Sequence, residues 1–559
     1  MFKKIAKDPI FWKKVREDKN YKPLVDRLFV LYDELCVQED IPSLRFNEYK
    51  MFFETGNRMI YEKNYFFRRR RMNCLALLAL VYPENDEYIE KLENTIWTIC
   101  DEYSWVVPAH IRDYPDIDKH TIDLFASETG YALSEIAFLL ENRLSELVKN
   151  RIRDEVQTRI IDRFISNVQG WEENRANWAA VCACSVAGAF MYNRPELFRL
   201  VSPRITLCME HFLSGYFNDG VCLEGLGYWE YGYGFFIWYA DMLKDFTNGE
   251  EDWFKDEKVK AIATFAQKAY LTENSTISFS DGIPGTKIML GMVHFLKSLY
   301  GDAISVIPME NCKTDDHCGR WCQHIRCFTF FNPDYLNEPF EKNAEYFLED
   351  SAWYIKKTPG YSFVIKGGHN DEPHNHNDVG SFVVAKGDKQ FLTDMGCGEY
   401  TKQYFRPETR YTILCNSSLG HSVPIINGKQ QGTGKEYAGS ISVGDGVVTV
   451  DMKGAYDDPT LRKLERRVEL FETSVRITDS CEFEKDGECV YRLVTFIKPE
   501  IADGGLKIDG AFLSYDTALV QTEITEDTHT THVDNEVVPV YLIDFRTQLG
   551  SITWDIEIN

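Results

Sequence analysis

Long apolar runs are missing from this sequence of 559 residues. Its first segment, MFKKIAKDPIFWKKVREDKNYK, scatters charged residues among the apolar ones and lacks the roughly 7 to 15 apolar residues of a signal peptide core. Apolar stretches such as LALLALVY, around Leu75 to Tyr82, are far shorter than the roughly 20 residues of a transmembrane helix. We therefore expect a cytoplasmic protein without a membrane segment.

The sequence also lacks a basic excess, because its formal net charge is -25. Phosphate binding requires a basic surface, so nucleic acid is not an expected partner. Glycine-rich phosphate loops, dinucleotide fingerprints and GxSxG elbows are missing as well. An acidic average surface is unfavourable for an acidic glycan too, but binding depends on the local field of a cleft.

Paired CxxC motifs are missing, although the chain has 15 cysteines. This odd number without a repeated spacing favours reduced thiols in a chain too large to need disulfides. One segment, CKTDDHCGRWCQHIRC, gathers cysteines and histidines without the spacing of ordinary zinc modules. Whether it binds a second metal is left open for Cys312, Cys318, Cys322 and Cys327.

The periodicity of apolar residues changes along the chain. From about Tyr21 to Tyr300 they recur at helical spacing, in segments such as YKPLVDRLFVLYDELC and NWAAVCACSVAGAFMY. After about Ala352 the period becomes two, with Gly, Asp and Asn turns between segments. We predict an α+β multidomain protein, with helical hairpins at residues 1–330 that form an α/α toroid, or a solenoid that periodicity alone does not distinguish from it, and an antiparallel β-sandwich at residues 331–559.

Two histidines in EPHNHNDVGSF, His374 and His376, are two residues apart and project to the same face of an extended segment. Asp394 follows in QFLTDMG and His421 in NSSLGHSVPIING. Nitrogen and oxygen donors of this kind suit zinc. Spacing alone leaves structural histidines as the alternative interpretation.

These segments, together with DGVCLEGLGYWEYG upstream, resemble the heparinase II/III-like polysaccharide lyases over nearly the whole chain. The resemblance implies one zinc ion per chain, mainly structural, held by His376, Asp394 and His421. It also implies that His374 faces the sugar.

The same resemblance assigns residues of the helical half. Tyr228 matches the catalytic tyrosine, and Asn177 matches the asparagine that grips the substrate carboxylate. Some family members have histidine after this asparagine, whereas this chain has Trp178, so a second base from that position is missing. Without the resemblance, the tyrosines here would be interpreted as core residues. Further expected substrate-binding residues are Trp178, Tyr231, Tyr404 and Arg410, with Tyr231, Tyr233 and Tyr404 as alternative bases and Tyr400 as another aromatic of the cleft.

The implied reaction is a β-elimination, in which a base removes the C5 proton beside a uronate carboxylate and the 4-linked oxygen leaves. Donors from Asn177 and His374 would stabilise the developing charge. A free phenol titrates near 10, so we expect Arg410, Arg406 or the zinc-side histidines to lower the pKa of the catalytic tyrosine. The acidic pair Asp123 and Glu128 is interpreted as structural.

The sequence thus predicts a carbon-oxygen lyase acting on acidic polysaccharides or oligosaccharides of the glycosaminoglycan type, such as hyaluronan, chondroitin or heparan. Alternatives are an alginate-type oligouronate lyase, a glycoside hydrolase, which needs two carboxylic acids facing the cleft, and a non-catalytic glycan-binding protein. The sequence does not identify the uronic acid, its sulfation, endo or exo action, or whether the chain forms a homo-oligomer.

Overall fold

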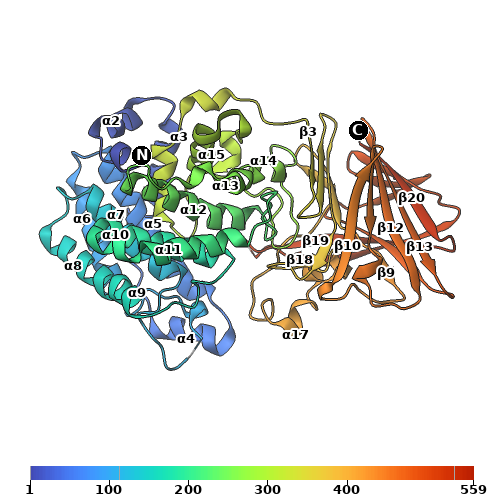
Figure 1. The fold of residues 1–559 in the computed structure, drawn as a ribbon, viewed down its shortest axis with the longest axis horizontal. Helices are drawn as coiled ribbons and strands as arrows, with labels where there is room; N and C mark the ends of the chain where they lie inside the picture. The colour runs from blue at the N-terminus through green and yellow to red at the C-terminus, as the bar shows by residue number, and fades with distance from the viewer. Residues whose placement is uncertain (1, 113, 534, 559) are drawn as a thin grey trace. The chain divides into compact units, whose positions relative to one another are not determined.

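The computed structural model describes residues 2–112, 114–533 and 535–558. The chain forms two compact units, which are described separately (Figure 1). The helical unit consists of Met1–Tyr216, Trp229–Lys260 and Ile288–Glu338. The sheet unit consists of Phe217–Tyr228, Ala261–Lys287 and Pro339–Asn559.

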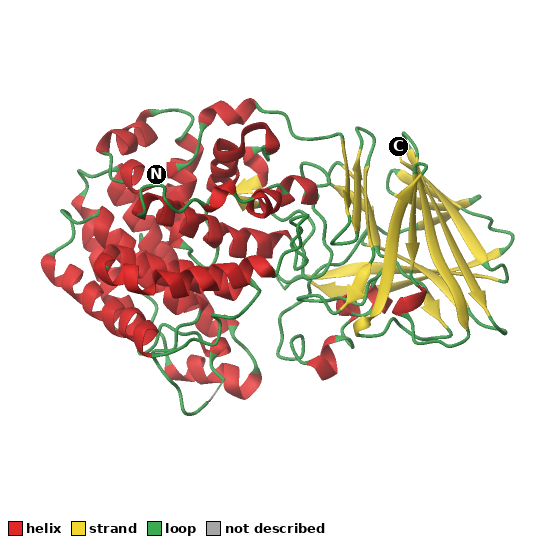
Figure 2. Ribbon diagram, viewed as in Figure 1, coloured by secondary structure: helices red, strands yellow, loops and turns green. Residues whose placement is uncertain are grey.

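Helices dominate the first part of the chain (Figure 2). The α-helices are α1 (Phe2–Ala6), α2 (Pro9–Glu17), α3 (Lys22–Leu35), α4 (Phe46–Thr55), α5 (Met59–Val81), α6 (Asp86–Cys100), α7 (Leu124–Leu139), α8 (Glu146–Val156), α9 (Asp162–Ser166), α10 (Asn177–Asn193), α11 (Pro195–Ser214), α12 (Leu226–Phe246), α13 (Glu257–Ala263), α14 (Phe265–Ala269), α15 (Leu290–Tyr300), α16 (Trp321–Thr329) and α17 (Pro407–Arg410).

The core of the helical unit contains α7 and α10, which are buried on nearly all sides. Small residues allow this, because α10 carries Ala, Cys, Ser and Gly along its length. A Cβ at Gly188 would lie 2.3 Å from a ring carbon of Tyr131, so the helices approach too closely for any larger residue there. Asp123 begins α7 by accepting the backbone N–H of Ala126 at 2.7 Å.

Strands dominate the last part of the chain (Figure 2). They are β1 (Ile288–Met289), β2 (Cys312–Lys313), β3 (Ala344–Leu348), β4 (Trp353–Lys357), β5 (Ser362–Lys366), β6 (Gly368–Asn370), β7 (Phe382–Lys386), β8 (Lys389–Leu392), β9 (Ile425–Ile426), β10 (Gly434–Gly444), β11 (Val447–Asp451), β12 (Leu461–Leu470), β13 (Ser474–Phe483), β14 (Cys489–Thr495), β15 (Glu500–Ala502), β16 (Gly505–Ile508), β17 (Ala511–Ser514), β18 (Val520–Thr530), β19 (Val537–Thr547) and β20 (Ser551–Ile558).

The sheet unit stacks antiparallel sheets around a shared core. Its strands follow the orders β15-β16-β17-β20-β13-β12-β11-β10-β6, β18-β19-β14-β9 and β3-β4-β5-β7-β8. Alternate residues of β20, such as Ile552, Trp554 and Ile556, are buried, as a strand with one face on a core requires. Phe363 of β5, Phe545 of β19 and Trp554 of β20 belong to the same apolar cluster, so this core joins all three sheets.

The predicted fold class is confirmed: helices precede antiparallel sheets. Closure of the helices into a ring, and a domain boundary at residues 330 and 331, stay predictions. The sheet unit also contains two earlier segments, Phe217–Tyr228 and Ala261–Lys287, and both contribute to the site described below. Within the described residues, no helix combines the length and apolar character needed to cross a bilayer.

Candidate active site

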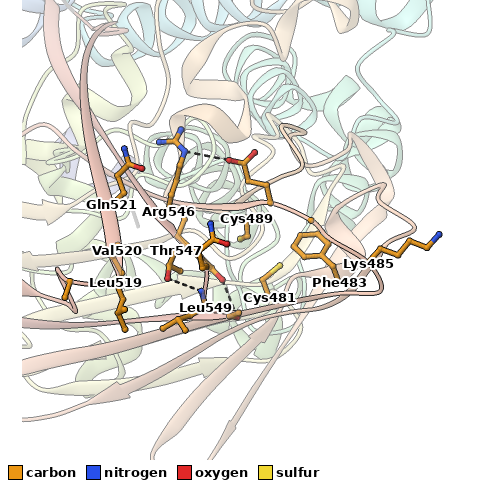
Figure 3. Close-up of a pocket in the computed structure, with 16 residues that line it drawn as sticks. Cys481, Phe483, Lys485, Cys489, Leu519, Val520, Gln521, Arg546, Thr547 and Leu549 are labelled. Carbon is orange, nitrogen blue, oxygen red and sulfur yellow. Dashed lines mark hydrogen bonds and ion pairs between the residues drawn. The ribbon is translucent and has the colours of Figure 1, made fainter.

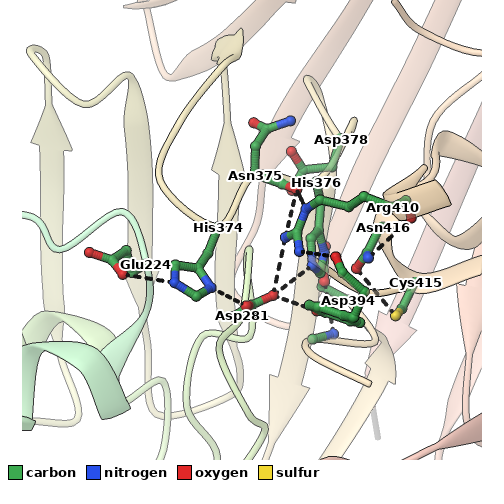
Figure 4. A network of polar contacts seen from close by, with 12 residues as sticks. Glu224, Asp281, His374, Asn375, His376, Asp378, Asp394, Arg410, Cys415 and Asn416 are labelled. Carbon is green, nitrogen blue, oxygen red and sulfur yellow. Dashed lines mark hydrogen bonds and ion pairs between the residues drawn. The ribbon is translucent and has the colours of Figure 1, made fainter. Parts of the chain in front are cut away.

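A buried carboxylate, Asp281, lies at the centre of a polar network in the sheet unit (Figure 4). Its Oδ2 accepts hydrogen bonds from Tyr400 at 2.8 Å and from His374 Nδ1. Its Oδ1 accepts the hydroxyl of Tyr404 at 2.5 Å and lies 3.2 Å from His376 Nε2. Burial alone would raise the pKa of Asp281, but the hydrogen bonds and charges of the two histidines hold it well below its usual range.

Close backbone contacts bring the segments of this network together. Gly225 has a φ of +105°, and a Cβ there would lie 2.8 Å from the Cα of Gly282. The backbone N–H of Cys397 donates to the carbonyl of Gly282 at 3.1 Å. Only glycine fits the first of these positions, because a side chain would separate the two loops. The loop that carries Glu224 is thereby held against the loop that carries Asp281.

His374 has a left-handed backbone, with φ of +56°, which is uncommon for a residue other than glycine. Its Nδ1 contacts Asp281, and its Nε2 lies 3.4 Å from Glu224 Oε2. Burial would lower the pKa of this imidazole, but the hydrogen bond to Asp281 and the charges of Asp281 and Glu224 raise it. The ring is therefore favoured in its protonated, donating form.

Tyr228 lies beside this imidazole, with a ring centroid separation of 4.5 Å from His374. Its hydroxyl lies 2.9 Å from that of Tyr400. Because Tyr400 donates its only proton to Asp281, Tyr228 is the donor in the pair of phenols. These contacts fix the direction in which the Tyr228 proton points.

The expectation of a lowered tyrosine pKa is wrong for this structure. Burial, together with the negative charges of Asp281 and Glu224, raises the pKa of Tyr228 well above its ordinary value. Arg410 donates to the carbonyl of Asn375 and lies 3.5 Å from Asp281, so its charge is directed at other groups. Arg406 is exposed.

His376, Asp394 and His421 offer three ligand atoms that all lie within 4.8 Å of one another. His421 Nε2 lies 2.8 Å from the carbonyl of Cys415 and donates there. Its Nδ1 lies 2.8 Å from Asp394 Oδ2. Burial would lower the pKa of His421, but Asp394 raises it, so Nδ1 faces the carboxylate through a proton or a metal ion. His376 Nδ1 is buried without a hydrogen-bond partner, so the donor set fits a metal ion.

Three of the expected site residues belong to the helical unit. Asn177 is buried at the start of α10, where a Cβ at Gly232 would lie 3.1 Å from its own Cβ. Trp178 is half-buried, with its ring centroid 4.9 Å from that of His110. Tyr231 donates its hydroxyl to Glu128.

The remaining alternatives have other partners. Tyr233 donates its hydroxyl to the carbonyl of Val259 at 2.6 Å and is fully buried. Tyr404 is fully buried, with Arg410 4.7 Å above its ring and its hydroxyl on Asp281. Both hydroxyls are therefore engaged within the protein.

The segment rich in cysteine and histidine does not assemble a second metal site. Within the described residues, His376, Asp394 and His421 form the only group of three such ligand atoms. Burial raises the pKa of Cys318 and Cys327 to about 12, which favours thiols rather than the thiolates that bind metal.

Sequence reasoning missed Asp281 and Glu224. Asp281 stands in FSDGIPG, a pattern typical of a turn, and its partners lie about 90 or more residues away along the chain. Glu224 lies within DGVCLEGLGYWEYG, the segment that carries the resemblance, so its position was a usable signal. Tyr400 was named only as a cleft aromatic, without its contact to Tyr228.

A separate hollow lies at the ends of β13, β14, β18 and β19 (Figure 3). Its lining includes Cys481, Phe483 and Arg546, and it shares no residue with the Asp281 network. Arg546 lies 2.8 Å from Glu523 and 3.9 Å from Glu488, so its charge is already paired. None of the residues expected to act in catalysis lines this hollow.

No protein-family model matches the chain, and no curated protein matches its sequence. Solved structures match its fold. A crystal structure of heparinase III has a TM-score of 0.64 at 13% identity, covering 90% of this chain and 78% of that chain. A mutant of the heparan sulfate lyase HepC from Pedobacter heparinus has a TM-score of 0.60 at 12% identity, with coverages of 98% and 90%.

The chain has a heparinase-like polysaccharide lyase fold. A chondroitin AC lyase from Streptomyces coelicolor A3, solved with chondroitin sulphate, has a TM-score of 0.56 at 10% identity, covering 98% of this chain and 82% of that chain. The heparinase-like fold accounts for helices followed by antiparallel sheets along nearly the whole chain. At these identities the likeness concerns the fold, and activity is argued from the site.

Proposed function

We propose that this protein is a polysaccharide lyase that cleaves uronic-acid-containing glycans, of the glycosaminoglycan type, by β-elimination. The observation that carries the proposal is the contact between Tyr228 and His374, whose ring centroids are 4.5 Å apart. They are distant in sequence, and the heparinase-like fold makes this pair a candidate base and donor.

The reaction breaks the C5–H bond of a uronate and the bond from C4 to the linking oxygen, and it forms a double bond between C4 and C5. Negative charge develops on the carboxylate as the proton leaves. Protonated His374 is suited to donate from Nε2 to that carboxylate. Asn177, assigned by resemblance, would supply a second donor from its side-chain amide.

Tyr228 is proposed to take the C5 proton and to return a proton to the leaving oxygen. Its phenol is protonated in the free protein, because burial and two carboxylates raise its pKa. It can therefore protonate the leaving oxygen at once. To act as the base, it must first release its own proton. Tyr400, 2.9 Å away, can accept that proton while it passes its own proton to Asp281, to which it is hydrogen-bonded.

The metal ion is proposed to be zinc, held by His376, Asp394 and His421. The unpartnered Nδ1 of His376 and the closeness of His421 Nδ1 to Asp394 Oδ2 support this assignment. Bound zinc would neutralise the carboxylate of Asp394 and keep both imidazoles unprotonated at their ligand atoms. His376 also contacts Asp281, so the site would help to orient the residue that holds His374.

A glycoside hydrolase is less well supported by the same network. Such an enzyme needs two carboxylic acids that face the sugar. Asp281 is completely buried and fully engaged by its partners, and Glu224 is buried as well. An imidazole that donates to a uronate carboxylate, together with the phenol of Tyr228, therefore explains the site better than a pair of catalytic acids.

The test is to incubate the protein with hyaluronan, chondroitin, heparan and alginate, and to follow ultraviolet absorbance and product masses. We expect products with an unsaturated uronate end from at least one of these acidic glycans, formed at least about 10²-fold more slowly by the Tyr228→Phe variant. Products with saturated ends would identify a hydrolase. Binding without any product would identify a glycan-binding protein, and either result would overturn the lyase proposal.

A further inference from the structure

Glu224 is a buried carboxyl group whose Oε2 has an ion-pair contact with His374 but no hydrogen bond within the described part of the chain. It is 7% exposed. The charged or titratable side chains that act on it are His374, whose Nε2 lies 3.4 Å from this oxygen, Asp281 and Tyr228. A buried acceptor without a hydrogen-bond partner is costly, so its retention needs an explanation.

Figure 4 shows Glu224, His374 and Asp281 in a row, with the imidazole between the two carboxyl groups. Asp281 is hydrogen-bonded to Nδ1, so the remaining N–H donor of the ring is at Nε2. The carboxylate of a bound uronate would approach this same Nε2, where Glu224 already lies. Two carboxylates that share one site cannot both remain ionised, and the stable arrangement is a single proton shared between them.

We infer that Glu224 takes up a proton when the substrate binds and hydrogen-bonds the uronate carboxylate as a carboxylic acid. This inference rests on the function proposed above and identifies the acid that neutralises the substrate. One proton moves from solvent to the Glu224 carboxylate, and its O–H then donates to the uronate oxygen. No covalent bond of the glycan changes in this step.

The consequence for the reaction is direct. A uronate carboxylate that accepts one hydrogen bond from Glu224 and another from His374 is nearly neutral, so removal of the C5 proton develops less charge. Burial and the charge of Asp281 raise the pKa of Glu224, while His374 opposes them, which supports a group that accepts a proton readily. Binding of an anionic substrate is then expected to weaken as the pH rises.

The experiment compares Glu224→Gln and Glu224→Ala with the wild type. Gln presents an N–H donor at every pH, so its kcat/KM should match the wild type at low pH and lose the decline seen in the wild type at high pH. Ala has no donor and should lose roughly 10-fold or more in kcat/KM at every pH, as expected for a hydrogen bond to a charged group. Exposed Glu399→Gln is the matched control and should keep the wild-type profile.

Proton uptake is measured separately by calorimetry with glucuronate as the probe and glucose as its neutral counterpart, in buffers of different ionisation enthalpy. We expect uptake close to one proton per glucuronate in the wild type above the pKa of Glu224, and none in Glu224→Gln. Equal uptake in both proteins, or a Gln variant that keeps the alkaline decline, would overturn the inference and assign the titration to another group such as His374. Lyase activity with no such difference leaves the proposed function standing, whereas failure to cleave any glycan or bind glucuronate overturns both.

Discussion

Glu135 of the helical unit and Glu224 of the sheet unit are both buried carboxyl groups, but their surroundings differ. In the helical unit, Glu135 and Arg326 are 0% and 1% exposed and form a network that is closed at the carboxylate, although Nε of Arg326 has no hydrogen-bond partner. Glu135 contacts both terminal nitrogens of Arg326 and also accepts hydrogen bonds from Tyr131, Tyr192 and Trp321. In the sheet unit, the network around Asp281 leaves Glu224 Oε2 and His376 Nδ1 without hydrogen-bond partners. A closed network stabilises a fold, whereas an open one is suited to bind something.

Histidines show the same contrast. Burial without an adjacent acid lowers the pKa of His294, in the helical unit, to about 4. In the sheet unit, Asp281 and Asp394 outweigh burial and raise the pKa of His374 and His421. His376 differs from both, because burial lowers its pKa although Asp281 lies beside it. An unprotonated imidazole is the form that binds a metal ion.

The largest expected effect concerns the closed network. Glu135→Ala should lower the free energy of unfolding by about 3–5 kcal/mol, because it leaves the guanidinium of Arg326 buried without its carboxylate. Urea denaturation followed by tryptophan fluorescence measures this change. Glu135→Gln keeps the shape and removes the charge, so it should destabilise as well. In the exposed pair of Lys22 and Asp26, Asp26→Ala is the control and should have little effect. A free energy of unfolding of Glu135→Ala near that of the wild type would contradict the structural role given to the Glu135 network.

The next largest effect concerns the open network. Tyr228→Phe should lower kcat by at least about 10²-fold and leave the fold and KM nearly unchanged, since it removes only the hydroxyl that moves the proton. Steady-state rates of unsaturated product formation measure this. Asn177→Ala and His374→Ala should each cost roughly 2 to 4 kcal/mol of transition-state stabilisation. Combined with Tyr228→Phe, their effects should be non-additive.

Near wild-type rates in Tyr228→Phe would show that this residue is not the base. Tyr400, which accepts its hydrogen bond, would then be tested first, followed by Tyr231, Tyr233 and Tyr404. Full activity in every one of these variants would exclude a tyrosine mechanism.

The sequence predicted the fold because helical spacing and strand alternation are local properties of the chain. It also predicted the group of His376, Asp394 and His421, which the structure brings together. The role of Asp281 could not be predicted from the sequence. Each partner of Asp281 lies in a distant segment, and a turn such as FSDGIPG has no distinctive pattern. The direction of the Tyr228 pKa shift was wrong for the same reason: charge at a site depends on which segments fold beside it.

The third effect tests the metal group. His421→Ala should abolish stoichiometric zinc binding, because it removes one of three ligand atoms and leaves Asp394 without its partner. Bound metal stabilises the wild type by about 2.7 kcal/mol when its free concentration is one hundred times Kd. A chelator should lower the stability of the wild type and leave that of the variant unchanged. Metal analysis that finds no zinc in the wild type, or full zinc in the variant, would contradict the assignment.

The smallest effect concerns the neutral histidine of the helical unit. His294 is 1% exposed, and its Nδ1 accepts the backbone N–H of Asn332 at 3.0 Å. Its pKa of about 4 in the folded protein lies below the value of 6.5 expected when unfolded.

The unfolded state therefore binds more protons between these two pKa values, so the free energy of unfolding falls as the pH falls below 6.5 and is restored above it. Between about pH 8 and about pH 5.5 the loss should be roughly 1 kcal/mol. His294→Gln keeps an acceptor for Asn332 without a titrating group, so its stability should depend less on pH by that amount. Urea denaturation of the wild type and the variant across this pH range measures the difference, and an unchanged slope in His294→Gln would show that this imidazole is not held neutral by burial.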